Sequence, residues 1–295
     1  MRVLVTGATG FVGSAVAEEL VKEGHQVIGL ARNAAGEAKL AAAGVSSYLG
    51  DLDQPDSLAQ AAEEAKADAI IHTAFNHDFS RFTENCAAER AVISALAKPD
   101  RPLLVTSGIG MITSTDIVTE QSRADYPHAR SPRSAMEALL DELAQQGMPV
   151  GAVRLPPSVH GQGDHGFVPM LIDIARRQGR AAYVGQGQNQ WPAVHRLDAA
   201  RCFALVLSKG FEPGDRFHAV AETGIEFGAI AESIGQHLNL PVDSVRPEQA
   251  ADYFGGFVHF AAIDNRASSD WTRQQLDWQP SGPDLLSDMD QAGYF

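Results

Sequence analysis

The sequence contains few cysteines and few cations for its length. Only 2 of its 295 residues are cysteine, and no Cys-x-x-Cys pair occurs, so a disulfide framework and a cysteine zinc site are excluded. The 23 Lys and Arg residues are outnumbered by 37 Asp and Glu residues, which gives a formal net charge of −14. This balance argues against nucleic acid and anionic membranes as partners. The negative net charge does not exclude a local basic site for one small anion.

Long apolar runs are missing as well. No stretch of about 20 apolar residues appears, so we expect no membrane span. The apolar segment at the N-terminus is too short for the core of a signal peptide and runs into Gly7. Hydrophobic residues make up 44% of the chain, which is ordinary for a globular protein. We therefore expect a soluble, cytoplasmic protein of one large or two small domains.

The first half of the chain alternates short apolar runs with helical patterns. The strands that we predict are 2–6, 26–31, 46–49, 69–73, 103–107 and 150–155. Helices are predicted between them at 12–23, 34–43, 55–65, 84–96 and 132–146. Runs that are apolar on both faces are typical of buried parallel strands. The alternation predicts an α/β fold with a doubly wound, Rossmann-type parallel sheet.

The second half is less regular. Helices are expected at 167–178, 198–207, 226–238 and 284–291, with a strand at 216–220. No internal repeat or low-complexity linker separates this half from the first. We predict a sheet domain over residues 1–155 and a smaller portion over 156–295, with segments around 191–220 returning to the sheet domain.

A glycine motif follows the first predicted strand and opens the first predicted helix. Gly7 permits a tight turn, Gly10 lets the backbone approach a pyrophosphate, and Gly13 lets the helix lie close to the sheet. The alternative is a glycine-rich turn that binds nothing. The residues that we assign to the cofactor from this motif are Thr6, Gly7, Thr9, Gly10, Phe11, Val12 and Gly13.

The end of the second predicted strand lacks the carboxylate that binds a ribose 2′-hydroxyl. The sequence there is Leu-Ala-Arg-Asn, and Arg32 offers a cationic fork to a 2′-phosphate. This favours NADP over NAD. The alternative for Arg32 is an ordinary solvated arginine at the start of a helix.

The glycine spacing resembles that of the extended short-chain dehydrogenases/reductases, which include sugar-nucleotide epimerases and dehydratases. Further segments match the family in order along nearly the whole chain: 50–52, 72–74, 105–107, 154–161, 194–198 and 276–280. The resemblance implies that Asp51 faces the adenine and that residues 154–161 lie beside the nicotinamide. The further cofactor-binding residues that it implies are Leu52, Thr73, Ala74, Pro156 and Ser158.

The resemblance also implies a serine and a Tyr-x-x-x-Lys pair for proton transfer. Ser107 is available, although it can also be the polar end of a buried strand. Counting back from Glu137 puts Arg133 at the lysine position and Ala129 at the tyrosine position. A second alignment uses Tyr126 with Arg130. Neither supplies a lysine, and arginine is not an equivalent replacement.

The proton donor therefore stays open. Tyr126 could serve after a loop adjustment, or another acid could act, namely His128, His160, Tyr183 or His195. We prefer His160, which stands where the family often has a tyrosine beside the nicotinamide, although a structural histidine is an equal alternative. A third alternative is NADP binding without turnover.

Taken together, these features predict an NADP-dependent oxidoreductase or an epimerase/dehydratase-like enzyme. Its substrate is expected to be a small molecule with a hydroxyl or carbonyl group. The alternative is a non-catalytic NADP-binding regulator or redox sensor. We expect no metal, because the histidines lack a recognisable ligand spacing. A homodimer could form through helices 84–96 and 132–146.

Overall fold

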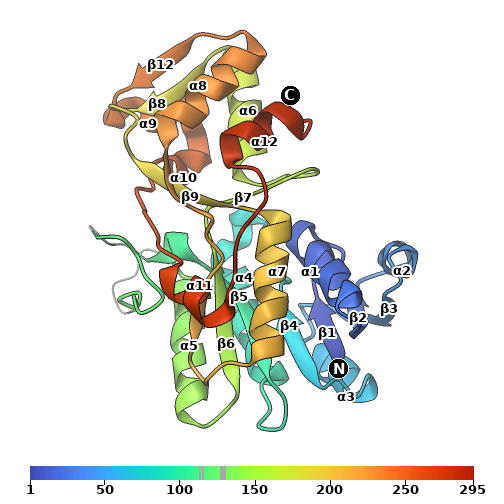
Figure 1. Ribbon diagram of the computed structural model, residues 1–295. Helices are drawn as coiled ribbons and strands as arrows, with labels where there is room; N and C mark the ends of the chain where they lie inside the picture. The colour runs from blue at the N-terminus through green and yellow to red at the C-terminus, as the bar shows by residue number, and fades with distance from the viewer. Residues whose placement is uncertain (113, 115, 127–130) are drawn as a thin grey trace.

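A seven-stranded parallel sheet is the main feature of the computed structural model, which describes residues 1–112, 114, 116–126 and 131–295 (Figure 1). The strand order is β10-β6-β5-β4-β1-β2-β3. All neighbours in it run parallel. The predicted doubly wound α/β fold is thus confirmed. The strands of this sheet are β1 (Arg2–Thr6), β2 (Gln26–Ala31), β3 (Ser46–Leu49), β4 (Ala69–His72), β5 (Leu103–Gly108), β6 (Val150–Leu155) and β10 (Arg216–His218).

Helices cover both faces of the sheet. On one face, α1 (Phe11–Lys22) and α7 (Arg196–Lys209) pack side by side over the sheet and share an apolar core with it. The other face is covered by α3 (Pro55–Glu64), α4 (Phe82–Leu96) and α5 (Ser134–Gln145), with a second core beneath them. The short helix α2 (Ala34–Ala42) lies at the β2–β3 edge. In β1, β2, β4, β5 and β6, alternate residues supply the two cores, as expected of a buried sheet.

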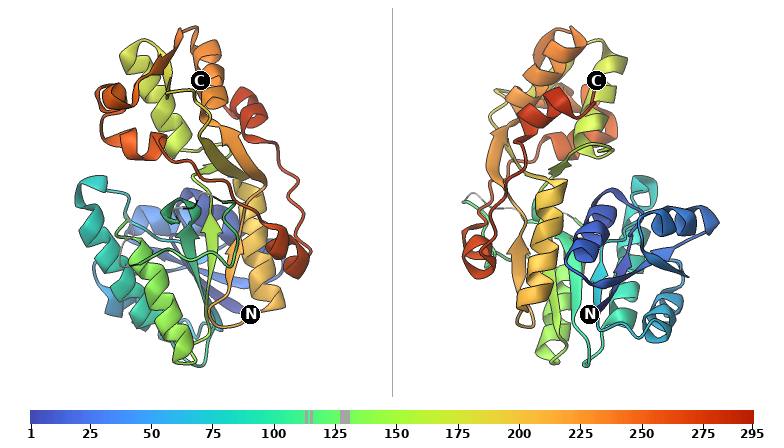
Figure 2. Two further views of the ribbon diagram at one scale, coloured as in Figure 1. Left: turned by 90° about the vertical axis from the view of Figure 1, so that its left-hand side faces the viewer. Right: turned by 45° about the vertical axis from the view of Figure 1, so that its right-hand side comes forward.

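The second portion lies above the carboxyl ends of the strands (Figure 2). It holds two small sheets, one with strand order β11-β9-β7 and one with β12 beside β8. Its own core is built from apolar residues of these sheets and the surrounding helices. The strands are β7 (Ser158–His160), β8 (Ala181–Val184), β9 (Gln190–His195), β11 (Glu222–Glu226) and β12 (Val242–Val245). The helices are α6 (Phe167–Gln178), α8 (Phe227–Leu238), α9 (Ala250–Phe254), α10 (Val258–Ala261) and α12 (Leu285–Gln291).

The chain passes between the two portions more than once. After β9 in the small sheet, α7 returns to pack on α1, and β10 joins the edge of the main sheet beside β6. The helix α11 (Asp270–Leu276) also lies against α7 and β10. Of the segments around 191–220, α7 and β10 therefore lie with the sheet domain, whereas β9 does not. The boundary at residue 155 stays a prediction.

Among the described residues, four single turns of 3-10 helix connect these elements. They are η1 (Phe79–Arg81), η2 (Ile109–Met111), η3 (Pro247–Gln249) and η4 (Gly255–Phe257). Both cysteines are free and buried. Within the described part of the chain, no helix is long and apolar enough to cross a membrane. A cytoplasmic location stays a prediction.

Candidate cofactor and active site

The glycine motif forms a tight loop between β1 and α1. Gly7 has a φ of +69°, a conformation that side chains rarely adopt, and a Cβ there would lie 2.8 Å from the Ala74 nitrogen. A Cβ on Gly13 would lie 2.2 Å from the Gly7 carbonyl oxygen and 2.5 Å from Thr73 Oγ1. Both positions therefore exclude any larger residue. The assignment of these two glycines to the cofactor stays a prediction.

At the N-terminus of α1, no side chain of the described residues satisfies the free N–H groups. Gly10 is the N-cap residue, and no side chain caps this end of the helix. Uncapped N–H groups and the positive end of the helix dipole form a site for a phosphate. Lys39 on α2 adds a cation, because its Nζ donates to the Thr9 carbonyl at 2.5 Å. The loop thus fits the pyrophosphate of a dinucleotide.

Arg32 stands directly after β2, where the 2′-position of an adenine ribose is predicted to lie. Its side chain is exposed and has no partner among the described residues. Asn33 beside it caps α2, since its Oδ1 accepts from the Gly36 nitrogen at 3.0 Å. The cap fixes the turn and leaves the guanidinium free to meet an anion.

The loops after β3 and β4 complete the predicted cofactor surface. Thr73 Oγ1 donates to the Thr6 carbonyl at 2.7 Å, and the Ala74 nitrogen donates to Thr6 Oγ1 at 3.2 Å. Asp51 is half-buried after β3, and its Oδ1 accepts from the Asp53 nitrogen at 3.1 Å. Thr6, Thr73 and Ala74 therefore join the loop after β4 to the glycine loop.

Further predicted cofactor residues lie in or beside these loops. Leu52 packs against the core beneath α3 and α4. Val12 is half-buried in the first turn of α1. Pro156 and Ser158 lie in the segment that leaves β6, and both are buried. The Ser158 Oγ has no hydrogen-bond partner among the described residues. The assignment of these four residues to the cofactor stays a prediction.

Ser107 faces α5 and is fully enclosed. Its Oγ donates to Glu137 Oε1 at 2.5 Å, and the residue is 1% exposed. Its neighbour Thr106 points to the opposite face of the sheet, because side chains alternate along a strand. Thr106 is half-buried as a residue, whereas its Oγ1 is itself buried and has no partner within the described part of the chain.

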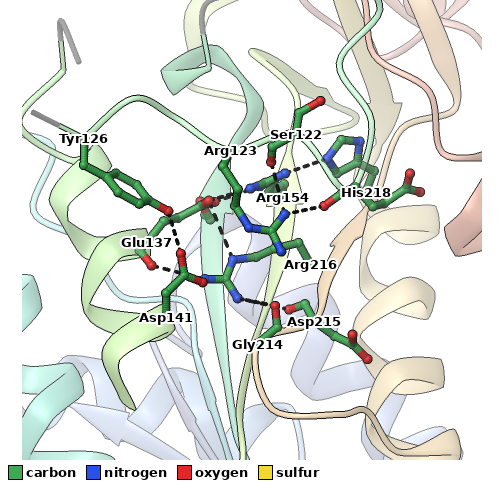
Figure 3. Close-up of polar contacts among 12 residues, drawn as sticks. Ser122, Arg123, Tyr126, Glu137, Asp141, Arg154, Gly214, Asp215, Arg216 and His218 are labelled. Atoms are coloured by element: carbon green, nitrogen blue, oxygen red, sulfur yellow. Dashed lines mark hydrogen bonds and ion pairs between the residues drawn. The ribbon is translucent and has the colours of Figure 1, made fainter. Parts of the chain in front are cut away.

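Glu137 is the centre of a buried network of ions (Figure 3). Arg154 contacts both oxygens of Glu137, at 2.7 and 2.5 Å, and Arg216 Nε lies 3.6 Å from Oε2. Burial opposes ionisation of the Glu137 carboxyl. The hydrogen bonds and charges of Arg154, the charge of Arg216 and the bond from Ser107 outweigh it, and the pKa falls to about 2. The carboxylate is therefore ionised at neutral pH.

Tyr126 lies at the outer side of this network (Figure 3). Its hydroxyl donates to Asp141 Oδ2 at 3.0 Å, and Asp141 Oδ1 accepts from Arg216 Nη2 at 2.7 Å. Burial, and then the charges of Glu137 and Asp141, raise the pKa of the Tyr126 phenol far above its usual range. A tyrosine held in this way is poorly suited to exchange a proton near neutral pH.

His218 closes the inner side of the network. Its Nδ1 contacts the Ser268 carbonyl at 2.7 Å, and a carbonyl can only accept, so Nδ1 carries the proton. The Nε2 then accepts from Arg154 Nη1 at 3.3 Å. Burial and the charge of Arg154 lower the pKa of His218 to about 3. The imidazole is neutral and serves to orient Arg154.

Arg133, at the position expected for lysine, already has hydrogen-bond and ring partners within the protein. Its guanidinium makes two hydrogen bonds to Glu89, at 3.1 and 2.7 Å, and lies 4.1 Å from the centre of the Phe75 ring. Burial and the charge of Arg133 lower the pKa of nearby His72 to about 3. His72 Nδ1 is bonded to Thr6 Oγ1 at 2.7 Å. The arginine therefore stabilises the loop after β4 rather than a catalytic phenolate.

The other predicted proton donors lie in the second portion or outside the described residues. His160 is fully buried and bonded through Nδ1 to Asp288 at 2.8 Å, and burial lowers its pKa. His195 caps α7, where its Nδ1 accepts from the Leu197 nitrogen at 3.4 Å. Tyr183 lies on β8, away from the main sheet. His128 falls outside the described residues, as do Ala129 and Arg130 of the two alignments.

Metal binding finds no support among the residues that the structure describes. They include no group of three or more His, Cys, Asp or Glu side chains able to hold an ion. The sequence pattern predicted no site role for Asp141 or Arg216, and it indicated Glu137 only as a reference position for the tyrosine and lysine. A buried Arg154 in a strand could have signalled the need for a carboxylate partner, but not which one.

The model of the NAD dependent epimerase/dehydratase family matches residues 3–218. The chain belongs to this family. Its predicted resemblance is thereby confirmed, and an NAD(P)-binding, oxidoreductase-like fold follows from the membership. The family includes epimerases, dehydratases and reductases, so an enzyme is indicated while the reaction is not.

The chain is similar to several proteins over most or all of its length. The chain is 44% identical to an uncharacterized protein of Schizosaccharomyces pombe over 300 residues, covering 100% of both chains. It is 30% identical to 2-alkyl-3-oxoalkanoate reductase of Stenotrophomonas maltophilia over 235 residues, covering 72% of this chain and 67% of the relative. Among solved structures, UDP-glucose-4-epimerase of Stenotrophomonas maltophila, with bound NAD and formylated UDP-arabinopyranose, superimposes with a TM-score of 0.75 at 18% identity. That superposition covers 100% of this chain and 97% of the epimerase.

Proposed function

We propose that the protein is an NADP(H)-dependent oxidoreductase that interconverts a carbonyl and a hydroxyl group on a small molecule. The observation that carries this proposal is that Arg32, at the end of β2 beside the glycine loop, has no partner in the part of the chain that the structure describes. A guanidinium pairs well with a phosphate, and no carboxylate stands there to accept a ribose 2′-hydroxyl. NADPH rather than NADH is the cofactor that this arrangement favours.

The residues of the chain would bind the cofactor across the carboxyl ends of the strands. The glycine loop and the N-terminus of α1 hold the pyrophosphate, and Arg32 holds the 2′-phosphate. Thr73 and Ala74 fix the loop that lies over β4. When bound, the nicotinamide supplies or accepts a hydride, the chemistry that no side chain can provide.

The candidate hydroxyl groups differ in whether they already have a hydrogen-bond acceptor within the protein. Those of Ser107 and Tyr126 are donated to carboxylates within the protein. The Thr106 hydroxyl, at the end of β5 on the other face, has no partner in the described part of the chain. Thr106 is therefore the group that we assign to hold the substrate oxygen.

A relative also supports carbonyl chemistry. The Stenotrophomonas reductase is named for the reduction of a 3-oxoalkanoate, which carries a ketone. At 30% identity over 72% of this chain, it makes ketone reduction the first reaction to test.

The direct test is to titrate the purified protein with NADPH and with NADH and then to follow NADPH oxidation with ketones and aldehydes. We expect NADPH to bind at least about tenfold more tightly than NADH, with turnover of at least one carbonyl compound. Equal binding of the two cofactors would contradict the NADP assignment. Tight NADPH binding without any turnover would favour the regulator or redox sensor instead. A homodimer through α4 and α5 stays a prediction.

A further inference from the structure

We propose that the substrate carries an aromatic or other apolar group beside its carbonyl, and is not a sugar nucleotide. This inference rests on the proposed function, because it names the substrate class of the same site. The observation that carries it is a row of aromatic rings that crosses from the sheet domain to the second portion, next to the glycine loop.

The aromatic row consists of Phe75, Phe82, Phe79, Phe260 and Phe167. Successive ring centres lie 6.0, 5.7, 5.4 and 4.5 Å apart in that order. The first three rings belong to the segment between β4 and the start of α4, and the last two belong to the second portion. Such spacings are those of favourable edge and tilted ring contacts.

The row begins beside the cofactor loop. Phe75 directly follows Thr73 and Ala74, the two residues that a Cβ on Gly7 would touch. His77 lies in edge contact with Phe75, with ring centres 5.1 Å apart. Phe11, the first residue of α1 directly after the glycine loop, contacts His165 of the second portion, with ring centres 5.7 Å apart. Aromatic rings therefore lie next to the cofactor loop in the sheet domain and in the facing part of the second portion.

The rings are not sealed in a core. Phe79 is 39% exposed, and the other four rings of the row are half-buried. Exposed aromatic surface costs free energy in water, and an apolar ligand lowers that cost by covering it. A patch of this kind beside a nucleotide loop is suited to the apolar part of a substrate.

The charges around the row do not suit a nucleoside diphosphate. Residues 254–263, which supply Phe260, contain no Asp, Glu, Lys or Arg. Arg133, which stacks on Phe75, is already paired with Glu89. Most arginines after residue 156 also have partners: Arg176 with Asp173, Arg180 with Asp243, Arg201 with Asp198, Arg216 with Asp141, Arg196 with the Gln162 carbonyl, and Arg273 with the carbonyls of Val220 and Ala221. A diphosphate is held best by convergent free cations, and most arginines of the second portion are already paired among the described residues, which leaves Arg81, exposed between Phe79 and Phe82, as the cation within the row.

The test compares two ligands in calorimetric titrations of the protein. The ligands are 4-phenyl-2-butanone and UDP-glucose, each titrated without cofactor, with NAD⁺ and with NADP⁺, so that no ketone is reduced during the measurement. We expect the ketone to bind measurably and more tightly than UDP-glucose. Tighter binding of UDP-glucose, or no binding of the ketone under any of the three conditions, overturns the proposal.

A pair of variants locates the binding. Phe79→Ser should raise the Kd of the ketone about tenfold or more, while the Kd of NADPH changes less than about twofold. Phe295→Ser is the matched control, because Phe295 is 38% exposed but stacks on His237, outside the row. An unchanged ketone Kd in Phe79→Ser contradicts the assignment. Ketone binding without turnover would instead contradict the proposed oxidoreductase and leave the substrate class in place.

Discussion

Ser107 donates its hydroxyl to Glu137 at a distance of 2.5 Å, inside the protein and away from solvent. The bond ties β5 to α5, and Glu137 in turn ties α5 to β6 and β10 through Arg154 and Arg216. A serine that resembles the catalytic serine of the family thus belongs to a structural network. The hydroxyl that remains free at the end of β5 is that of Thr106, which has no partner among the described residues.

Substitution of these two neighbours should separate structure from catalysis. Ser107→Ala removes one donor to a buried carboxylate, so the free energy of unfolding in urea should fall by about 1–3 kcal/mol. The kcat for ketone reduction should stay within about threefold. Thr106→Val keeps the side-chain shape, and kcat should fall about tenfold or more. The opposite pattern would restore Ser107 to the catalytic role.

Glu137→Gln should destabilise the protein in a pH-dependent manner. Removing one partner of a buried ion pair costs about 3–5 kcal/mol near neutral pH. The folded-state pKa of Glu137 is lowered from 4.5 to about 2, so its stabilisation is complete above pH 4.5 and is lost as the pH falls toward 2. Urea unfolding at pH 7, 5, 4 and 3 should show the gap between wild type and variant narrowing below pH 4.5. A constant gap would argue against an ionised Glu137.

Arg32→Ala should weaken NADPH binding and spare NADH binding. Loss of a charge-assisted contact to the 2′-phosphate should raise the Kd of NADPH about tenfold or more. Fluorescence titration of both cofactors measures the effect. Arg177→Ala, on the second portion, serves as the control and should change neither Kd. Equal weakening of both cofactors by Arg32→Ala would remove the 2′-phosphate assignment.

Gly13→Ala should disrupt the glycine loop. The added Cβ would lie 2.2 Å from the Gly7 oxygen, too close for the loop to keep its place. We expect a loss of about 1–3 kcal/mol in unfolding free energy and no measurable NADPH binding. Gly256→Ala is the control, since no atom lies within 4 Å of the position that its methyl group would take. NADPH binding that survives in Gly13→Ala would show that the loop is not the cofactor cradle.

Tyr126→Phe should leave turnover nearly unchanged. The Tyr126 hydroxyl is donated to Asp141, and its pKa is raised first by burial and then by nearby carboxylates. The kcat at pH 7 should therefore stay within about threefold of wild type, measured by NADPH oxidation. A fall of about 100-fold would identify Tyr126 as the proton donor after a rearrangement of its loop.

The sheet domain could be predicted from the sequence because most of its strands are short apolar runs buried on both faces. The predicted bounds of β1, β2, β3 and β6 match the structure, although β3 reads Ser-Ser-Tyr-Leu and has no fully buried residue. The second portion was harder, since β12 reads Val-Asp-Ser-Val and carries polar residues that its edge position tolerates. Strands of this kind are fixed by their neighbours and not by a pattern of their own.

The predicted site also has one part that local sequence indicates and one part that depends on the tertiary fold. The cofactor loop depends on glycines close together in the chain, so its geometry followed from local spacing. The network around Ser107 and Tyr126 depends on contacts across the fold, since Glu137, Arg154 and Arg216 come from three separate elements. Nothing in the local sequence around Ser107 indicates that a carboxylate accepts its hydroxyl.

The return of α7 and β10 to the main sheet has a consequence for how the protein can be divided. A fragment that ended at Leu155 would leave β6 as an unpaired edge and would uncover the apolar side of α1 on which α7 packs. The nucleotide-binding half is therefore completed only when the ribosome has made residue 218, well into the second portion. The residues of the sheet domain are therefore not made as one continuous segment. A stable fragment of this domain should need the chain up to β10.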